Sequence, residues 1–511
     1  MMSRFLLGTG GLVFAFTALT VVAPTAEAAP CEAANIRWAS SSNNVYVMGA
    51  GTVCTLTEID VIADKANLEL VDPGTKTWFV GSNIIVQQGA TLNLHGSESG
   101  GDVDELRLRS DSAVAFLRAY WGTIDIKDTK IQSWTGSGPD TDSGSLRPYI
   151  QVKSFLEGDT PRESTMNISN SDISYLGYYA AESYGLSWKV LGTGAGLYDK
   201  VGVKGTVTSN HIHHNYFGAY TWGADAMVWT DNEFANNRQY GLDPHDNSDN
   251  LNIENNLFHH NGNHGMICSR FCDHLTIRGN TSYNNTGNGF MLHRLANDSL
   301  FENNEAYNNT DSGIAIFDSH SNTIRNNNSH DNKNGMRFSV GSSNNLIQDN
   351  IIDDSSSYGM YFFKGSDAPT EVGDGRPKNN RFINNTITDS SIYGIKLREA
   401  DNNLFQDNDF INNGKTLLLE AATGNRFLNN LISDNDDVGI TLSGATNHEL
   451  SGNTIERNTN TGVHLKSGST GAKITNNIIR NHTKYGILVT SGTGPTISGN
   501  TFSNNGKNIG P

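Results

Sequence analysis

Residues 240–246, Tyr-Gly-Leu-Asp-Pro-His-Asp, place two carboxylates and an imidazole within four positions of one another. A neutral histidine oriented by an aspartate is a common arrangement for a general base near neutral pH. Further along the chain come Ser269 with Arg270, and then His293 with Arg294. A guanidinium can neutralise a carboxylate through two charge-assisted hydrogen bonds, so these residue types predict proton transfer on a negatively charged ligand.

These residues sit within a repeat that is marked by glycines. A glycine followed by alternating residues recurs every 22–24 positions from Gly218 to Gly359 and resumes further on, at Gly394, Gly439, Gly462 and Gly486. A period of this length is typical of one coil of a solenoid. The first and third residues after each glycine are apolar, so they are expected to point inward, and the second and fourth outward. Asparagines between the repeats suit the coil corners. The pattern predicts an all-β protein, a right-handed parallel β-helix with coils of about 22–24 residues.

The outward positions form the candidate ligand surface. Neighbouring parallel strands lie about 4.8 Å apart, so His245, Arg270 and Arg294 are expected on three adjacent strands, within reach of one or two sugar units. A cationic stripe along a groove suits a linear polyanion better than a small molecule. We therefore expect flanking ligand contacts from a further set of outward residues, namely Ser269, His293, Arg294, Arg337 and Lys396.

The remaining chain indicates an exported protein with one main domain. Residues 1–28 resemble a secretory signal peptide, 29–65 are expected to cap the open end of the coils, and 66–511 to form the β-helix with its catalytic groove. Residues 365–378 are expected to project as a loop that walls the groove. No other segment is apolar enough to span a membrane, and the hydrophobic content of 36% suits a solenoid with a thin core.

Charge and cysteine usage narrow the classes of partner. A net charge of −17 argues against nucleic-acid binding. Among the four cysteines, Cys31 and Cys54 can pair in an oxidising compartment, whereas Cys268 falls at an inward position that suits a small core residue. The pairing of Cys272 stays open. No zinc-binding pattern is present, and neither a metal nor a cofactor is expected.

Residues 240–246 resemble the signature of the alginate (mannuronan) C-5 epimerases, and residues 264–270, His-Gly-Met-Ile-Cys-Ser-Arg, resemble the following coil in the periplasmic branch of that family. Residues 174–177 and 183–187 are also similar to that branch, and the likeness covers roughly residues 80 to 500. The glycine-rich modules of the secreted, calcium-dependent branch are absent from the sequence. Leu242 departs from the commoner Phe or Ile, and no family role can be transferred to Arg294. The resemblance implies a periplasmic, calcium-independent isomerase that acts on polymannuronate or alginate, with a polysaccharide secretion complex as a further partner.

The resemblance also implies roles for the residues of the signature. His245 would remove the C-5 proton of β-D-mannuronate, and Arg270 would neutralise the sugar carboxylate. Asp243 and Asp246 would orient these two groups. Tyr240 or a water molecule would return a proton from the opposite face to give α-L-guluronate. Two alternatives stay open: a polyuronate lyase, in which the same intermediate loses its O-4 substituent, and a non-catalytic protein that guides polysaccharide through the periplasm.

Overall fold

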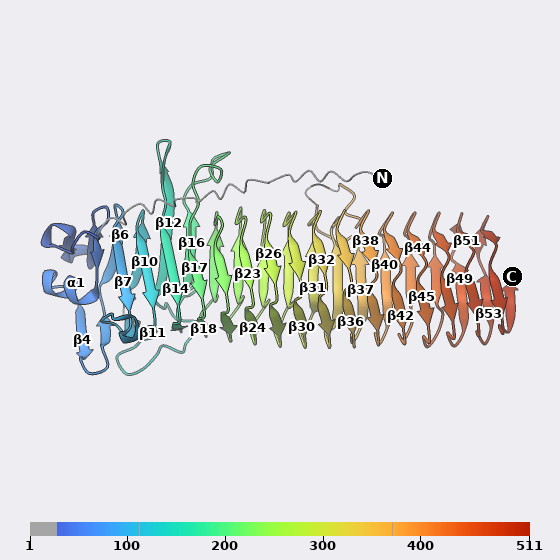
Figure 1. Cartoon of the computed structure of the whole chain (residues 1–511), viewed down its shortest axis with the longest axis horizontal. Coiled ribbons are helices and arrows are strands. Elements are labelled where there is room, and N and C mark those ends of the chain that lie inside the picture. The colour runs from blue at the N-terminus through green and yellow to red at the C-terminus, as the bar shows by residue number, and fades with distance from the viewer. Residues whose placement is uncertain (1–27, 112, 370, 372) are drawn as a thin grey trace, which may run out of the picture.

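The protein forms a long right-handed parallel β-helix (Figure 1), which confirms the fold predicted from the repeat. The structure is a computed structural model that describes residues 28–511 except 112, 370 and 372. The predicted signal peptide, residues 1–28, therefore lies outside the described residues apart from its last position. No helix among the described residues is long and apolar enough to cross a membrane.

One coil consists of three short strands, each of which stacks on its equivalent in the next coil. In the central coil these strands are β20 (Val228–Thr230), β21 (Glu233–Ala235) and β22 (Leu242–His245). The next coil repeats them as β23 (Asn252–Glu254), β24 (Leu257–His259) and β25 (Met266–Cys268), all paired in parallel. The helix therefore has three long faces, and the face with β22 carries the candidate site.

The inward column of side chains fills the core as the alternation predicted. Leu242, Met266 and Phe290, each one position after a repeat glycine, are at most 1% exposed. On the face of β21, Phe234 and Phe258 stack with ring centroids 5.1 Å apart. Equivalent apolar residues of successive coils stack on one another. Each coil therefore buries its apolar surface against the neighbouring coils.

The glycines and the asparagines of the repeat recur for different physical reasons. A Cβ on Gly241 would lie 2.4 Å from the carbonyl oxygen of Gly265, so the coils approach too closely there for any side chain. Buried asparagines at the corners form a ladder: Asn280 Nδ2 donates to Asn304 Oδ1 at 3.0 Å, and Asn304 Nδ2 donates to Asn327 Oδ1 at 3.1 Å. These bonds pair polar groups that would otherwise be buried without partners.

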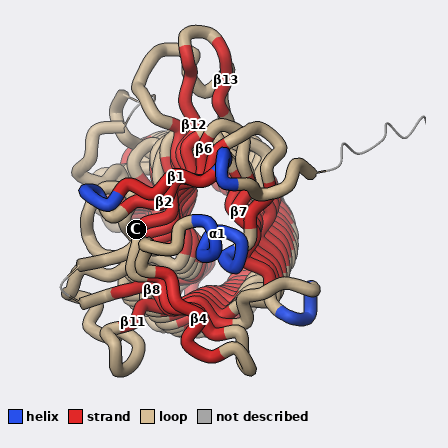
Figure 2. Tube along the Cα trace, turned by 90° about the vertical axis from the view of Figure 1, so that its left-hand side faces the viewer, coloured by secondary structure: helices blue, strands red, loops and turns tan. Residues whose placement is uncertain are grey.

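The N-terminal end of the stack is covered by non-repetitive structure (Figure 2). Helix α1 (Leu56–Ile62) lies across the end and buries Leu56 and Ile59. Strand β1 (Ile36–Ala39) runs antiparallel to β2 (Asn44–Met48), and β2 is already paired in parallel with β6 (Asn83–Gln87). A disulfide between Cys31 and Cys54, a pairing that the sequence left open, ties this end together.

Two segments depart from the regular coils near the candidate site. Strand β12 (Tyr149–Glu157) extends beyond the stack and forms a hairpin with β13 (Thr160–Arg162), visible at the top of Figure 1. The insertion between β37 (Tyr358–Phe363) and β38 (Arg381–Ile383) projects from the helix, as expected for residues 365–378.

Candidate active site

The face that carries β22 brings the predicted reactive residues together. It continues from β16 (Leu186–Val190) and β19 (Ala219–Trp222) through β22 and β25 to β28 (Phe290–His293). Parallel register sets Trp222 beside His245 and Tyr220 beside Asp243. Side chains on one strand face alternate inside and outside, so His245 points to the outer surface from β22.

Asp246 connects the two residues that the sequence singled out for chemistry. His245 Nδ1 lies 2.5 Å from Asp246 Oδ2, while Arg270 Nε and Nη2 donate to Asp246 Oδ1 and Oδ2 at 2.5 and 2.8 Å. The Asp246 side chain is 5% exposed, whereas those of His245 and Arg270 are 27% and 41% exposed. One buried carboxylate therefore holds an imidazole and a guanidinium side by side at the surface.

Electrostatics keep this carboxylate ionised. Burial acts to raise the pKa of Asp246, but hydrogen bonds from His245 and Arg270 outweigh it and hold the pKa below its usual value. The hydrogen bond to Asp246 likewise raises the pKa of Arg270. At neutral pH the pair is thus charged, and an aspartate that accepts from Nδ1–H leaves Nε2 of a neutral histidine as the basic nitrogen.

Of the two aspartates expected to orient His245 and Arg270, Asp246 contacts both, and Asp243 has a different partner. Its side chain is buried, and Ser269 Oγ donates to Asp243 Oδ1 at 2.6 Å. Burial raises the pKa of Asp243 to about 7. Ser269, which is also expected to contact a ligand, is thus the hydrogen-bond partner of this carboxylate. The alternation of inward and outward residues correctly places Asp243 on the outer face, but it does not predict that this side chain is buried.

An apolar patch continues from Asp243 along the same outer column. The equivalent positions in the next three coils are Ile267, Met291 and Ala315, which pack together with Tyr240 and Phe317 on the outside of the helix. The sequence analysis took the outward residues here to be mainly cationic. The patch instead gives the site a low-polarity wall beside its charged residues, which strengthens electrostatic interactions there.

Aromatic side chains frame His245 on its other side. The Trp222 ring lies 5.3 Å from the His245 ring at an interplanar angle of 13°, and Tyr220 lies 5.6 Å away. Tyr240 contacts Phe217 rather than His245, with ring centroids 5.0 Å apart, and burial raises its pKa to about 12. The sequence analysis missed Trp222 and Tyr220. A signal was present, because Trp222 follows Gly218 at the offset at which His245 follows Gly241.

Two lysines extend the His245 column toward the N-terminus. Lys153 and Lys189 align in register with each other, and Lys189 aligns with Trp222. Glu182 contacts both, at 3.6 Å from Lys153 Nζ and in a shorter pair with Lys189. The sequence analysis missed this cluster because the period is irregular before Gly218.

The predicted flanking residues lie in different environments. Arg294 is 45% exposed and lies 3.4 Å from Asp367 of the projecting insertion. Burial lowers the pKa of His293 to about 4. Arg337 is only 17% exposed and pairs with Asp311 at 3.1 Å, which leaves little of its guanidinium for a ligand. Lys396 lies over the Tyr358 ring, 5.4 Å from its centroid.

A disulfide encloses the residues that complete the site. Cys268 and Cys272 are bonded to each other, where the sequence had indicated an ordinary core position for Cys268. Both cysteines are fully buried, and the five-residue segment they close contains Ser269 and Arg270. The cross-link therefore anchors the partners of both aspartates to the body of the helix.

Comparison with known proteins agrees with this architecture. The family described as right-handed beta helix region matches residues 161–294, 246–373 and 375–509. The mannuronan C5-epimerase of Pseudomonas aeruginosa is 32% identical over 195 residues, which are 37% of this chain and 33% of that protein. The mannuronan C5-epimerase AlgG of Azotobacter vinelandii is 30% identical over 178 residues, 34% of this chain and 31% of that protein.

A solved structure shows the same fold. The crystal structure of the periplasmic alginate epimerase AlgG superposes with a TM-score of 0.60 at 21% identity, covering 70% of this chain and 83% of that one. The sequence matches span about a third of the length of the curated relatives. The chain belongs to the right-handed β-helix family and is related within it to the mannuronan C5-epimerases.

Proposed function

We propose that the protein is an isomerase that converts β-D-mannuronate to α-L-guluronate within alginate, in the periplasm. The observation that carries this proposal is the single buried carboxylate, Asp246, that holds His245 and Arg270 together on an open face. The relatives named mannuronan C5-epimerase support the same reaction and substrate.

His245 acts as the base in this mechanism. Its Nδ1–H donates to Asp246, so Nε2 accepts the C-5 proton; among the described residues, Nε2 has no hydrogen-bond partner that competes. Asp246 stabilises the imidazolium that forms, as the buried aspartate does in catalytic triads. Trp222 stacked on the ring limits its rotation.

Arg270 stabilises the intermediate. Removal of a proton α to a carboxylate moves negative charge onto the carboxylate oxygens, giving a dianion. With Nε and Nη2 held by Asp246, Arg270 keeps Nη1 for the sugar carboxylate. A fixed donor aimed at the charge that develops lowers the barrier without reorganisation during the reaction.

The second proton reaches C-5 from the face opposite His245. Tyr240 and a water molecule are the two donors that the sequence suggested, whereas Tyr220 contacts the His245 ring and so lies on the side of the base. Burial raises the pKa of both tyrosines above the usual value, so both carry their proton at neutral pH. Arg294 and Lys396 on one side, and Lys189 on the other, would contact neighbouring uronates of the polymer.

Incubation of polymannuronate with the protein in heavy water tests the proposal. We expect guluronate with deuterium at C-5 by NMR, and no product from His245→Ala at equal protein concentration. Unsaturated chain ends, detected by their ultraviolet absorbance, would show a lyase instead. Polymer binding without any change of the sugar would show a guiding protein and contradict the proposal.

A further inference from the structure

A second group of histidines and carboxylates lies on a different face of the helix, outside the site described above. This face carries β15 (Asp172–Ser174), β18 (His211–His213) and β21, which pair in parallel. Asp172 and His211 are register partners in consecutive coils. His211 and His213 are two apart on one strand, so their side chains share a face.

The three side chains converge on a small space. His211 Nδ1 lies 3.1 Å from Asp172 Oδ2, and His213 Nε2 lies 3.3 Å from both oxygens of Asp172. The ligand atoms of all three residues lie within 4.8 Å of one another. Ligands at the bond lengths of tetrahedral zinc lie about 3.4 Å apart. The separations between Asp172 and each histidine match this value, and the two histidine nitrogens lie within 4.8 Å of each other.

Asp172 supplies the negative charge of the group. Burial acts to raise the pKa of Asp172, but hydrogen bonds from His211 and His213 outweigh it and lower the pKa, so the carboxylate is ionised at neutral pH. The hydrogen bond to Asp172 raises the pKa of His211, so a metal ion would displace the proton that His211 shares with this carboxylate.

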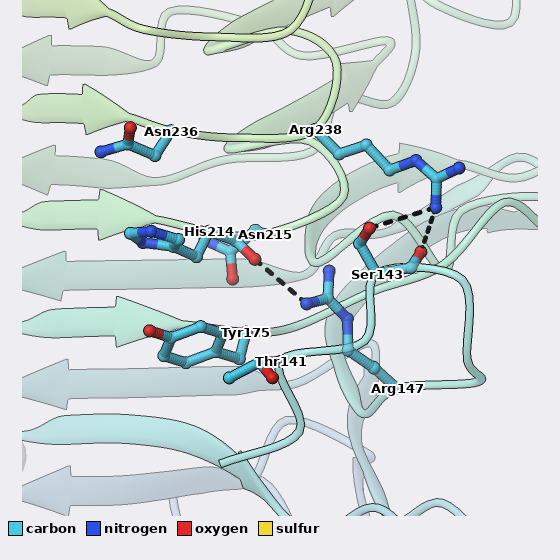
Figure 3. Close-up of a pocket in the computed structure, with 8 residues that line it drawn as sticks. All are labelled: Thr141, Ser143, Arg147, Tyr175, His214, Asn215, Asn236 and Arg238. Atoms are coloured by element: carbon cyan, nitrogen blue, oxygen red, sulfur yellow. Dashed lines mark hydrogen bonds between the residues drawn. The ribbon is translucent and has the colours of Figure 1, made fainter.

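A surrounding shell holds these ligands in place. Glu233 Oε1 lies 3.9 Å from His211 Nε2, beyond hydrogen-bond distance, and 2.8 Å from His259 Nε2. The buried Arg147 donates to the carbonyl oxygen of His214 at 3.1 Å, beside a pocket of about 320 Å³ (Figure 3), and so fixes the backbone next to His213. A carboxylate that moved onto the outer nitrogen of His211 would orient that imidazole for metal binding.

We propose that Asp172, His211 and His213 bind a divalent transition-metal ion of the zinc class, with Glu233 as the outer partner of His211. Two imidazoles and one carboxylate suit such ions better than calcium or magnesium, which prefer oxygen ligands. The ion would join the coils of β15 and β18. It would lie apart from His245, which is on another face, so the site is independent of the proposed reaction.

Titration of metal-free protein with Zn²⁺ tests the site, by calorimetry and by the thermal midpoint of unfolding. We expect one site that raises the midpoint in wild type. In His211→Ala/His213→Ala the affinity should fall at least tenfold, and Glu233→Gln should weaken binding about tenfold. His330→Ala is the matched control, because His330 pairs with Glu305 and Asp331 on the same face, without a second histidine, and should bind as wild type does.

Crystals of the wild-type protein soaked in Zn²⁺ give a second measurement that does not depend on variants folding. Anomalous scattering should place the ion about 2.1 Å from the imidazole nitrogens of His211 and His213. An ion elsewhere, the absence of binding, or equal affinity in the double variant would overturn the proposal. A Ca²⁺ titration that raised the midpoint as much as Zn²⁺ would also overturn it.

Discussion

Replacement of Asp246 by asparagine tests how the candidate site works. The aspartate accepts three hydrogen bonds, one from His245 and two from Arg270. An asparagine has one acceptor oxygen and one donor NH2 group. If the oxygen faces His245, the NH2 group meets the donors of Arg270. If it faces Arg270, His245 is held in the tautomer whose Nε2 is protonated and cannot act as a base.

The expected loss follows from this geometry. The equivalent change in a catalytic triad, which also imposes the wrong tautomer, lowers kcat by about 10⁴, and general bases contribute about 10²–10⁴. We expect kcat of Asp246→Asn to fall by about 10³, equivalent to about 4 kcal/mol of barrier. KM should change less than about tenfold, because Arg270 stays available to bind the sugar carboxylate.

The assay is the initial rate of guluronate formation from polymannuronate at saturating polymer, measured by NMR. Asp249→Asn is the matched control. Burial raises the pKa of Asp249 to about 6, but it hydrogen-bonds the backbone of Asp273 rather than His245. Asp249→Asn should keep wild-type kcat. If Asp246→Asn keeps more than a tenth of the wild-type rate, then Asp246 does not set the tautomer of His245 and the reasoning is refuted.

Three further changes give distinct outcomes. Because burial raises the pKa of Asp243 from 3.8 to about 7, the folded state binds more protons than the unfolded state in that interval, so stability falls as pH rises from about 4 to 7. Asp243→Asn should remove this dependence, a difference of up to about 4 kcal/mol at pH 8, seen in unfolding midpoints. Cys268→Ser/Cys272→Ser should lower kcat about tenfold to a hundredfold, with less effect on KM, because Arg270 loses its anchor. Asn304→Ala should lower the thermal midpoint, by about 2–4 kcal/mol of stability, because its ladder partners stay buried and unpaired.

Each of these changes has a control. If the unfolding midpoints of wild type and Asp243→Asn change with pH in the same way, the raised pKa of Asp243 is contradicted. The Cys31–Cys54 disulfide at the distant capped end should be removable without loss of kcat, and an equal loss there would show a general effect on folding. Asn328→Ala, outside the ladder and only partly buried, should shift the midpoint far less than Asn304→Ala.

The sequence predicted the fold because each coil repeats the same physical constraints. Glycines occur where the backbones of neighbouring coils meet, apolar residues alternate with outward-pointing residues along each strand, and asparagines hydrogen-bond at the corners. All three patterns are visible in the sequence. The proximity of His245 and Arg270 followed from the same period. The irregular coils before Gly218 hid Lys189, whose place in the His245 column comes only from strand register.

The rest depended on neighbours that are remote in sequence. Asp243 lies on the predicted face, but it is buried, and its hydrogen-bond partner Ser269 is 26 residues away in the sequence. Which aspartate orients His245 is decided by the turn after β22, where Asp246 has a φ of 29° and folds back toward the surface groups. Asp172 and His211 are 39 residues apart and meet only because their strands are stacked. Residue types alone do not give these pairings.

The central claim is that one sugar ring contacts both His245 and Arg270. The most direct measurement is a crystal structure of the His245→Ala variant with a mannuronate oligomer bound. The account predicts a uronate carboxylate within hydrogen-bonding distance of the Arg270 guanidinium, with C-5 of that residue facing position 245. An oligomer that lies on another face of the helix, or whose carboxylates avoid Arg270, would contradict it.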